Sequence, residues 1–269
     1  MTIIVCVNSA SSADLTGTVG IGSEFSSTDS GPGFSIGTLY LPLTVTLYPT
    51  DSVDVSLEIP FLYQHGGVAS VIGSQGLHGG GMESGKTVAS PSSASQHSLL
   101  SSPGMSTGYA AGLGDITVKV GYMLAPEERW NMGIRPTFYL KFPTADSTKG
   151  LGTGKYDEGV SVQLSKTVEN WHAFVEPGYT VQGREAGMAL KNYFSYRTGV
   201  GYQATASLLP WLVVKGTTPL AEGLDPVMEV RLAAQYSLNE KSWLEGYVAK
   251  GVTAATSEYG FGLSLTRGF

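Results

Sequence analysis

The sequence contains almost no cysteine, few charged residues and no long hydrophobic run. Cys6 is the single cysteine among 269 residues, which excludes a disulfide framework and a cysteine-based zinc site within one chain. The apolar runs are short, and the run at residues 208–214 is interrupted by a proline. Because a membrane-spanning helix needs about 20 consecutive apolar residues, the sequence excludes a helical membrane protein.

Positive charge is also scarce. The chain has 16 Lys and Arg against 22 Asp and Glu, a net charge of −6. The basic residues form no stripe, so we expect no nucleic-acid partner. Charged residues make up only 14% of the chain, whereas an average soluble domain has roughly 25%. A membrane β-barrel fits this composition, because its strands need only about 10 residues with apolar side chains at alternate positions.

The first thirteen residues have a composition of their own. Residues 3–7 are apolar and residues 11–13 are small, a pattern that resembles the end of a secretory signal peptide whose basic start is missing. The alternative is a disordered N-terminal tail. In both cases we expect residues 14–269 to form a single barrel domain.

Apolar and small polar residues alternate from Leu15 to the C-terminus, the pattern of strands with two different faces. In the last segment Tyr259, Phe261 and Leu263 share one face, and glycine, serine and threonine share the other. One segment is irregular, because Lys250 falls on the apolar face with Leu244 and Val248, and this predicts a bulge or a local irregularity there. Strands are predicted at residues 15–25, 38–48, 53–63, 115–124, 131–142, 158–167, 171–182, 193–204, 211–218, 227–238, 243–252 and 258–269.

The connections between these segments alternate between short and long. The short class comprises residues 49–52, 125–130, 168–170, 207–210 and 239–242, and the long class comprises residues 26–37, 64–114, 143–157, 183–192, 219–226 and 253–257. Short periplasmic turns and long extracellular loops are typical of outer-membrane barrels. The predicted fold is therefore all-β, an antiparallel up-and-down transmembrane barrel of about twelve strands in the outer membrane of a Gram-negative bacterium. An even strand number places both termini in the periplasm.

The four tryptophans all lie beside short turns. Because the indole ring is apolar and its N–H is polar, tryptophan favours the membrane–water interface. We therefore predict an aromatic girdle at one rim, to which the terminal residue Phe269 also belongs. The predicted girdle tryptophans are Trp130, Trp171, Trp211 and Trp243.

Charged residues on the strands fall mostly on the polar face. Arg or Lys facing lipid at mid-membrane costs about 2–4 kcal/mol, so we expect these side chains to line the lumen. They either form a structural lattice of ion pairs or select solutes by charge and size, and both roles are compatible. Acids and bases lie mainly on different strands, which predicts a transverse electric field. The predicted lumenal residues are Glu24, Asp54, Glu58, Asp115, Lys119, Arg135, Lys141, Glu176, Arg197, Lys215, Glu229 and Arg231, with Glu245 as a further candidate.

The connection at residues 64–114 is exceptionally long, and loops of this length are usually functional or disordered. Two alternatives stay open, a constriction inside the lumen and a mobile external loop. It holds His65, His78 and His97, whose spacing matches no metal-ligand pattern, so we expect no metal and no cofactor. Hydrolysis needs a rigidly held serine with a histidine base. Because His97 and Ser98 lie in this loop and His172 lies at a rim, we expect no catalytic site.

Three segments resemble a known family. Residues 112–116 read Gly-Leu-Gly-Asp-Ile, residues 142–146 read Phe-Pro-Thr-Ala-Asp, and residues 151–154 read Leu-Gly-Thr-Gly, followed by Asp157. Together with the closing strand they resemble the outer-membrane transporters of the MetA pathway of phenol degradation. Ala145 stands where the family pattern usually has glycine. The resemblance spans about residues 113–269 and implies a barrel that passes aromatic or other small hydrophobic compounds.

These observations converge on a porin-like channel for the passive uptake of small, aromatic or hydrophobic solutes. The expected partners are the lipid bilayer, a small-molecule solute and the outer-membrane assembly machinery, which reads a C-terminal aromatic residue such as Phe269. The alternative function is that of a non-conducting barrel, which acts as a membrane anchor or binds partners through its long external loop.

Overall fold

A computed structural model describes residues 16–29, 35–65, 109–184 and 190–269 of the chain. The predicted signal remnant at residues 1–13 and most of the predicted loop at residues 64–114 lie outside these ranges. The strands are β1 (Thr16–Asp29), β2 (Ser35–Thr50), β3 (Val53–His65), β4 (Tyr109–Leu113), β5 (Ile116–Tyr122), β6 (Gly133–Phe142), β7 (Asp157–Val168), β8 (Trp171–Gln182), β9 (Tyr193–Tyr202), β10 (Leu208–Thr217), β11 (Val227–Asn239), β12 (Ser242–Gly251) and β13 (Tyr259–Gly268).

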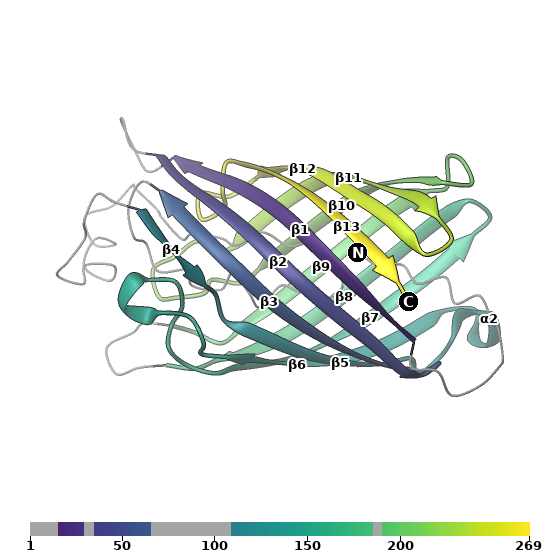
Figure 1. Ribbon diagram of the computed structural model, residues 1–269, viewed down its shortest axis with the longest axis horizontal. Helices are drawn as coiled ribbons and strands as arrows, with labels where there is room; N and C mark the ends of the chain where they lie inside the picture. The colour runs from purple at the N-terminus through teal and green to yellow at the C-terminus, as the bar shows by residue number, and fades with distance from the viewer. Residues whose placement is uncertain (1–15, 30–34, 66–108, 185–189) are drawn as a thin grey trace.

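The strands form one closed antiparallel sheet. Strand β1 pairs with β2 on one side and with β13 on the other, which joins the first described strand to the last. Both β4 and β5 pair with β3, so they share one position in the wall. The described strands therefore occupy twelve positions, and the predicted fold is confirmed. Figure 1 shows the barrel from the side, with strands steeply tilted to its long axis.

The two ends of the barrel carry different connections. The turn end contains the short turns at residues 51–52, 169–170, 203–207 and 240–241, together with residues 123–132. The loop end contains the connections at residues 143–156, 218–226 and 252–258, together with the ends of β1, β3 and β8 and the starts of β2, β4 and β9. The C-terminus and the short helix α2 (Glu127–Trp130) both lie at the turn end (Figure 1). The loop end also carries a 3-10 helix, η1 (Ser147–Lys149). In the described ranges no helix is long and apolar enough to cross a membrane.

A bulge separates β4 from β5. Phe61 pairs with Leu113, whereas Glu58 pairs with Thr117, so three residues at 114–116 lie opposite two on β3. One extra residue reverses which positions face inward. Asp115 keeps the lumenal parity of Thr117 and Lys119, whereas Ala110 lies on the lumenal face of β4 although the intact alternation would place it outside. This reversal explains why the sequence predicted a strand at 115–124 and missed β4.

The two faces of the wall follow the predicted alternation. On β3, Leu57, Phe61 and Tyr63 are exposed on the outer face, while Glu58 and Leu62 are buried on the lumenal face. The predicted irregularity around Lys250 is wrong, because β12 pairs regularly with β11 from Gly251 to Trp243. Lys250 does point outward, but at the loop end, where its Nζ lies 3.1 Å from Glu258 Oε1. There a charge can reach the aqueous interface.

Candidate functional site

The lumen holds the charged side chains of the barrel. Eleven of the twelve residues predicted to line it lie on the lumenal face of their strands, as does Glu245, and Asp115 lies in the bulge between β4 and β5. Ten of the twelve are buried, and Asp54 and Arg135 are half-buried. A buried charge is stable only when an opposite charge or hydrogen bonds compensate for its lost hydration. The contacts of these residues therefore determine what the lumen can do.

Lys141 on β6 connects two aspartates at the loop end. Its Nζ lies 3.1 Å from Asp115 Oδ2 and 2.7 Å from Asp157 Oδ2, and it donates a 3.4 Å hydrogen bond to Thr153 Oγ1. Asp115 Oδ1 accepts a 3.0 Å hydrogen bond from the backbone N–H of Ala145. One cation therefore ties the bulge, the β6–β7 connection and the start of β7 together.

A second group joins β2, β3, β5 and β6. Lys119 Nζ lies 3.6 Å from Glu58 Oε2, and the hydroxyl of Tyr40 donates a hydrogen bond to Glu58 Oε1. On the same strands Arg135 contacts Asp54 through both ends of its guanidinium, and Nε donates to Oδ1 at 3.0 Å. Each base is therefore paired with an acid of a neighbouring or next-neighbouring strand.

A third group runs across β10, β11 and β12 to β1. Glu229 is contacted by Arg231 and by Lys215, whose Nζ lies 3.6 Å from Glu229 Oε1. The Arg231 guanidinium lies 4.0 Å from the centre of the Tyr247 ring, and the Tyr247 hydroxyl donates a 2.6 Å hydrogen bond to Glu24. All five side chains are at least 94% buried.

A fourth group lies on β7, β8 and β9. Arg197 Nη2 donates a 2.5 Å hydrogen bond to Glu176 Oε2, and the hydroxyl of Ser161 donates a 2.8 Å bond to Glu176 Oε1. The Arg197 guanidinium also lies 5.2 Å from the centre of the Phe174 ring. This pair thus borders an apolar part of the wall.

The pairing corrects the prediction of a transverse field. The sequence placed acids and bases mainly on different strands, but Lys119, Arg135, Lys141 and Arg197 each contact an acid from another strand, and Arg231 contacts one on its own. Separated charges would create a field across the lumen, whereas adjacent opposite charges cancel over distances longer than the pair. The lumen is therefore polar but locally neutralised.

An apolar cluster lies on the lumenal wall near the turn end. Phe174, Leu209, Trp211 and Val213 pack together and are all buried, with Ala233 against them. The rings of Phe174 and Trp211 meet edge to face at 5.7 Å. Among the described residues, none accepts a hydrogen bond from the buried indole N–H of Trp211. Sequence reasoning missed this cluster, although the run of residues 208–214 has too many apolar residues for an alternating strand.

Two predictions for the aromatic girdle are therefore wrong. Trp211 is only 6% exposed and faces the lumen. Trp243 shares the lumenal face of β12 with Tyr247, two alternations away. Both were assigned from their position beside a turn, but the face of a strand residue is set by its parity. Trp171 lies on the outer face, Trp130 on α2, and both are more than half exposed, as is Phe269.

A second apolar cluster closes around the β6–β7 connection. Leu151 and Ala145 of this connection pack with Tyr40, Leu62 and Ala110 from the lumenal faces of β2, β3 and β4. The connection therefore folds against the inside of the wall instead of extending away from the barrel. A third cluster at the loop end contains Tyr193, Leu220, Val227 and Ala255, with Leu224 packed against it.

Only some of the residues considered for catalysis or metal binding lie in the described ranges. His78, His97 and Ser98 lie outside them. His172 Nδ1 lies 3.2 Å from the Thr167 hydroxyl at the exposed turn end. Among the residues that the structure describes, no group of three or more His, Cys, Asp or Glu side chains could hold a metal ion.

A model of the family described as "Putative MetA-pathway of phenol degradation" matches residues 72–266. The chain belongs to this family. The resemblance read from residues 112–116, 142–146 and 151–154 is thereby confirmed, and it extends further toward the N-terminus than those residues indicated. None of the curated protein sequences compared with the chain matches it.

Solved structures with this fold are outer-membrane proteins. The chain is similar to the COG4313 outer membrane channel from Pseudomonas putida F1, with a TM-score of 0.65 and 13% identity over 100% of both chains. It is also similar to the NanC porin, with a TM-score of 0.53 and 9% identity over 92% of this chain and 97% of that one. It is similar to the KdgM porin as well, with a TM-score of 0.52 and 7% identity over 94% of this chain and 99% of that one. The fold is that of an outer-membrane β-barrel.

Proposed function

We propose that this barrel is a channel for the passive uptake of small, neutral, hydrophobic or aromatic solutes across the outer membrane. The observation that carries the proposal is the apolar cluster around Trp211 on the lumenal wall, which combines two aromatic rings with aliphatic side chains in an otherwise charged lumen. Such a surface suits a flat apolar molecule. The family description names phenol degradation, which agrees with this solute class.

The paired charges support the same solute class. Ion channels that select by charge expose rings of one sign to the solute. Here Glu58, Glu176 and Glu229 each contact a base, so their charges are compensated by the wall itself. A neutral solute passes such a lumen without displacing a counterion. We propose that the turn end, which holds the C-terminus, faces the periplasm, and that Phe269 is read by the assembly machinery.

Single-channel recording in planar bilayers tests the proposal. We expect the purified full chain to conduct ions weakly, and a neutral aromatic probe, benzyl alcohol, to block this current. Trp211→Ala should weaken the block about fivefold, the effect of losing about 1 kcal/mol of aromatic contact. Trp171→Ala is the matched control, because Trp171 lies on the outer face of β8 and not in the lumen. This variant should leave the block unchanged.

The rival function makes the opposite prediction. A barrel that serves as an anchor or a surface-binding protein shows no conductance in the full chain and no effect of benzyl alcohol. We propose that the barrel has no enzymatic activity. When the purified protein is incubated with phospholipid vesicles, we expect no release of fatty acid. Hydrolysis that disappears in His97→Ala would contradict the channel proposal and indicate a lipase.

A further inference from the structure

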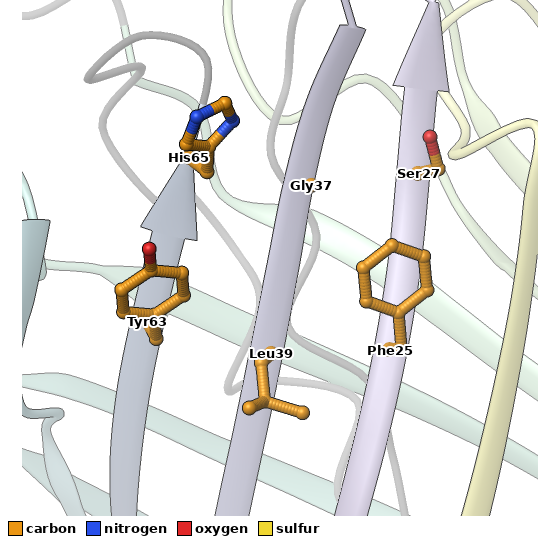
Figure 2. A pocket seen from close by; sticks show the side chains of 6 residues that line it. All are labelled: Phe25, Ser27, Gly37, Leu39, Tyr63 and His65. Carbon is orange, nitrogen blue, oxygen red and sulfur yellow. The ribbon is translucent and has the colours of Figure 1, made fainter. Parts of the chain in front are cut away.

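The outer surface of the barrel has a hollow at the loop end. It is lined by Phe25 and Ser27 of β1, Gly37 and Leu39 of β2, and Tyr63 and His65 of β3, and its volume is about 310 Å³. Figure 2 shows Phe25 and Tyr63 on either side of β2, with the strand bare at Gly37 between Ser27 and His65. The hollow is distinct from the lumen, because these residues alternate with the lumenal residues of the same strands.

The register orders the lining into two rows. Ser27 pairs with Gly37, and Gly37 pairs with His65, which makes the row nearer the loop end. Phe25 pairs with Leu39, and Leu39 pairs with Tyr63, which makes the row nearer the membrane centre. The hollow therefore changes from polar to apolar along the direction in which a membrane lipid lies.

Aromatic residues on the neighbouring strands place the hollow at the membrane interface. Tyr259 continues the polar row on β13, and Tyr109 continues it on β4. Both are more than half exposed. Exposed tyrosines on the outer face of a barrel form the girdle at the level of the lipid headgroups. At this level an amphiphile has its polar group beside one row and its chain beside the other.

Gly37 creates the hollow. A Cβ added at Gly37 would lie 3.4 Å from the Phe25 ring, an ordinary contact, and no backbone atom lies closer. The absence of a side chain is therefore not required by packing of the strand itself. It leaves space over β2 that the bilayer must fill.

We propose that this hollow binds one lipid of the leaflet at the loop end. Its acyl chain lies over Leu39 between Phe25 and Tyr63, and its headgroup oxygens accept hydrogen bonds from the Ser27 hydroxyl and the His65 ring. The hollow is continuous with the lipid-facing surface of the barrel, so a lipid is the occupant that already surrounds it. The proposal concerns the outer face and does not depend on the channel function.

Native mass spectrometry of the full chain, titrated with palmitoyl-oleoyl phosphatidylglycerol, tests the proposal. Gly37→Leu fills the hollow, and Gly246→Leu is the matched control, because Gly246 lies on the outer face of β12 and its added Cβ would also meet its nearest neighbour at an ordinary 3.5 Å. We expect Gly37→Leu to lower the occupancy of the first bound lipid about fivefold. The Gly246→Leu variant should retain it as the wild type does.

A second variant separates headgroup recognition from filling. His65→Phe keeps a ring of similar size and removes the N–H, and we expect a loss of about fivefold, as for one ordinary hydrogen bond. Heat-dependent migration on gels confirms that each variant is folded. Equal occupancy in the wild type and in both Gly37→Leu and His65→Phe overturns the proposal. Displacement of the lipid by benzyl alcohol at low concentration also overturns it, since the hollow would then be a solute site.

Discussion

Glu24 and Tyr247 are separated by 223 residues in the chain and joined by a 2.6 Å hydrogen bond inside the barrel. The bond crosses β13 at Gly262, where an added Cβ would lie 2.4 Å from the Tyr247 ring and 3.1 Å from Glu24. A glycine at this position thus lets two non-neighbouring strands share a contact across the strand between them. The closure of the sheet is reinforced by its lumenal side chains.

Removal of the Tyr247 hydroxyl should destabilise the barrel. Tyr247→Phe leaves the buried Glu24 carboxylate without this donor, which costs about 1–3 kcal/mol. Urea-induced unfolding in detergent micelles measures the loss. Tyr236→Phe is the control, because Tyr236 is about half exposed on the outer face, and it should change the free energy of unfolding by less than about 0.5 kcal/mol.

Loss of the Lys141 charge should release the β6–β7 connection. Lys141→Met leaves Asp115 and Asp157 buried without their cation, which typically costs about 3–5 kcal/mol. We expect faster cleavage by trypsin after Lys149, together with a lower midpoint of urea unfolding. Asp146→Asn breaks the exposed pair between Asp146 and Lys149 and retains the cleavage site. It should change stability little, and equal protection in both variants would contradict the assigned role of Lys141.

A methyl group at Gly201 should displace the Trp211 ring. An added Cβ would lie 2.6 Å from the indole, so Gly201→Ala forces the ring from its place, at a cost of about 1–3 kcal/mol. We expect weaker block by benzyl alcohol in the same recordings. Gly246→Ala has space for its Cβ and should leave the block and the stability unchanged. If benzyl alcohol blocks the Gly201→Ala variant as strongly as the wild type, the solute does not contact Trp211.

The β6–β7 connection contains a carboxyl group, that of Asp146, whose pKa is lowered. A hydrogen bond from the Thr148 hydroxyl lowers the pKa of Asp146, and Lys149 acts in the same direction. A carboxyl whose pKa is lower in the folded state contributes stability above its unfolded pKa of about 3.9 and loses it as the pH falls through the folded value. Thr148→Val should raise the pKa of Asp146 toward its usual value, as followed by carboxyl carbon shifts in NMR, and no change would exclude this hydrogen bond.

Much of the fold follows from local pattern. Period-two alternation predicted residues 171–182 as the strand that β8 forms, and it placed Glu24, Lys215 and the other predicted lumenal charges of the strands on the inner face. The reason is that side-chain direction in a strand depends only on parity, which can be read along the chain. The alternation of short and long connections likewise predicted the two ends of the barrel.

Tertiary structure decided the features that parity does not contain. The extra residue at 114–116 reverses the faces of β4, and only the pairing with β3 reveals it. The packing of Trp211 against Phe174 depends on the pairing of β8, β9 and β10, whereas its lumenal face follows from the parity that it shares with Lys215 and that proximity to a turn obscured. Partners such as Glu24 and Tyr247, or Lys141 and Asp157, meet because the sheet closes with one register. The sequence by itself therefore determined which residues face the lumen, and only the closed barrel decided which of them touch, since contact across strands depends on register and curvature that no single strand encodes.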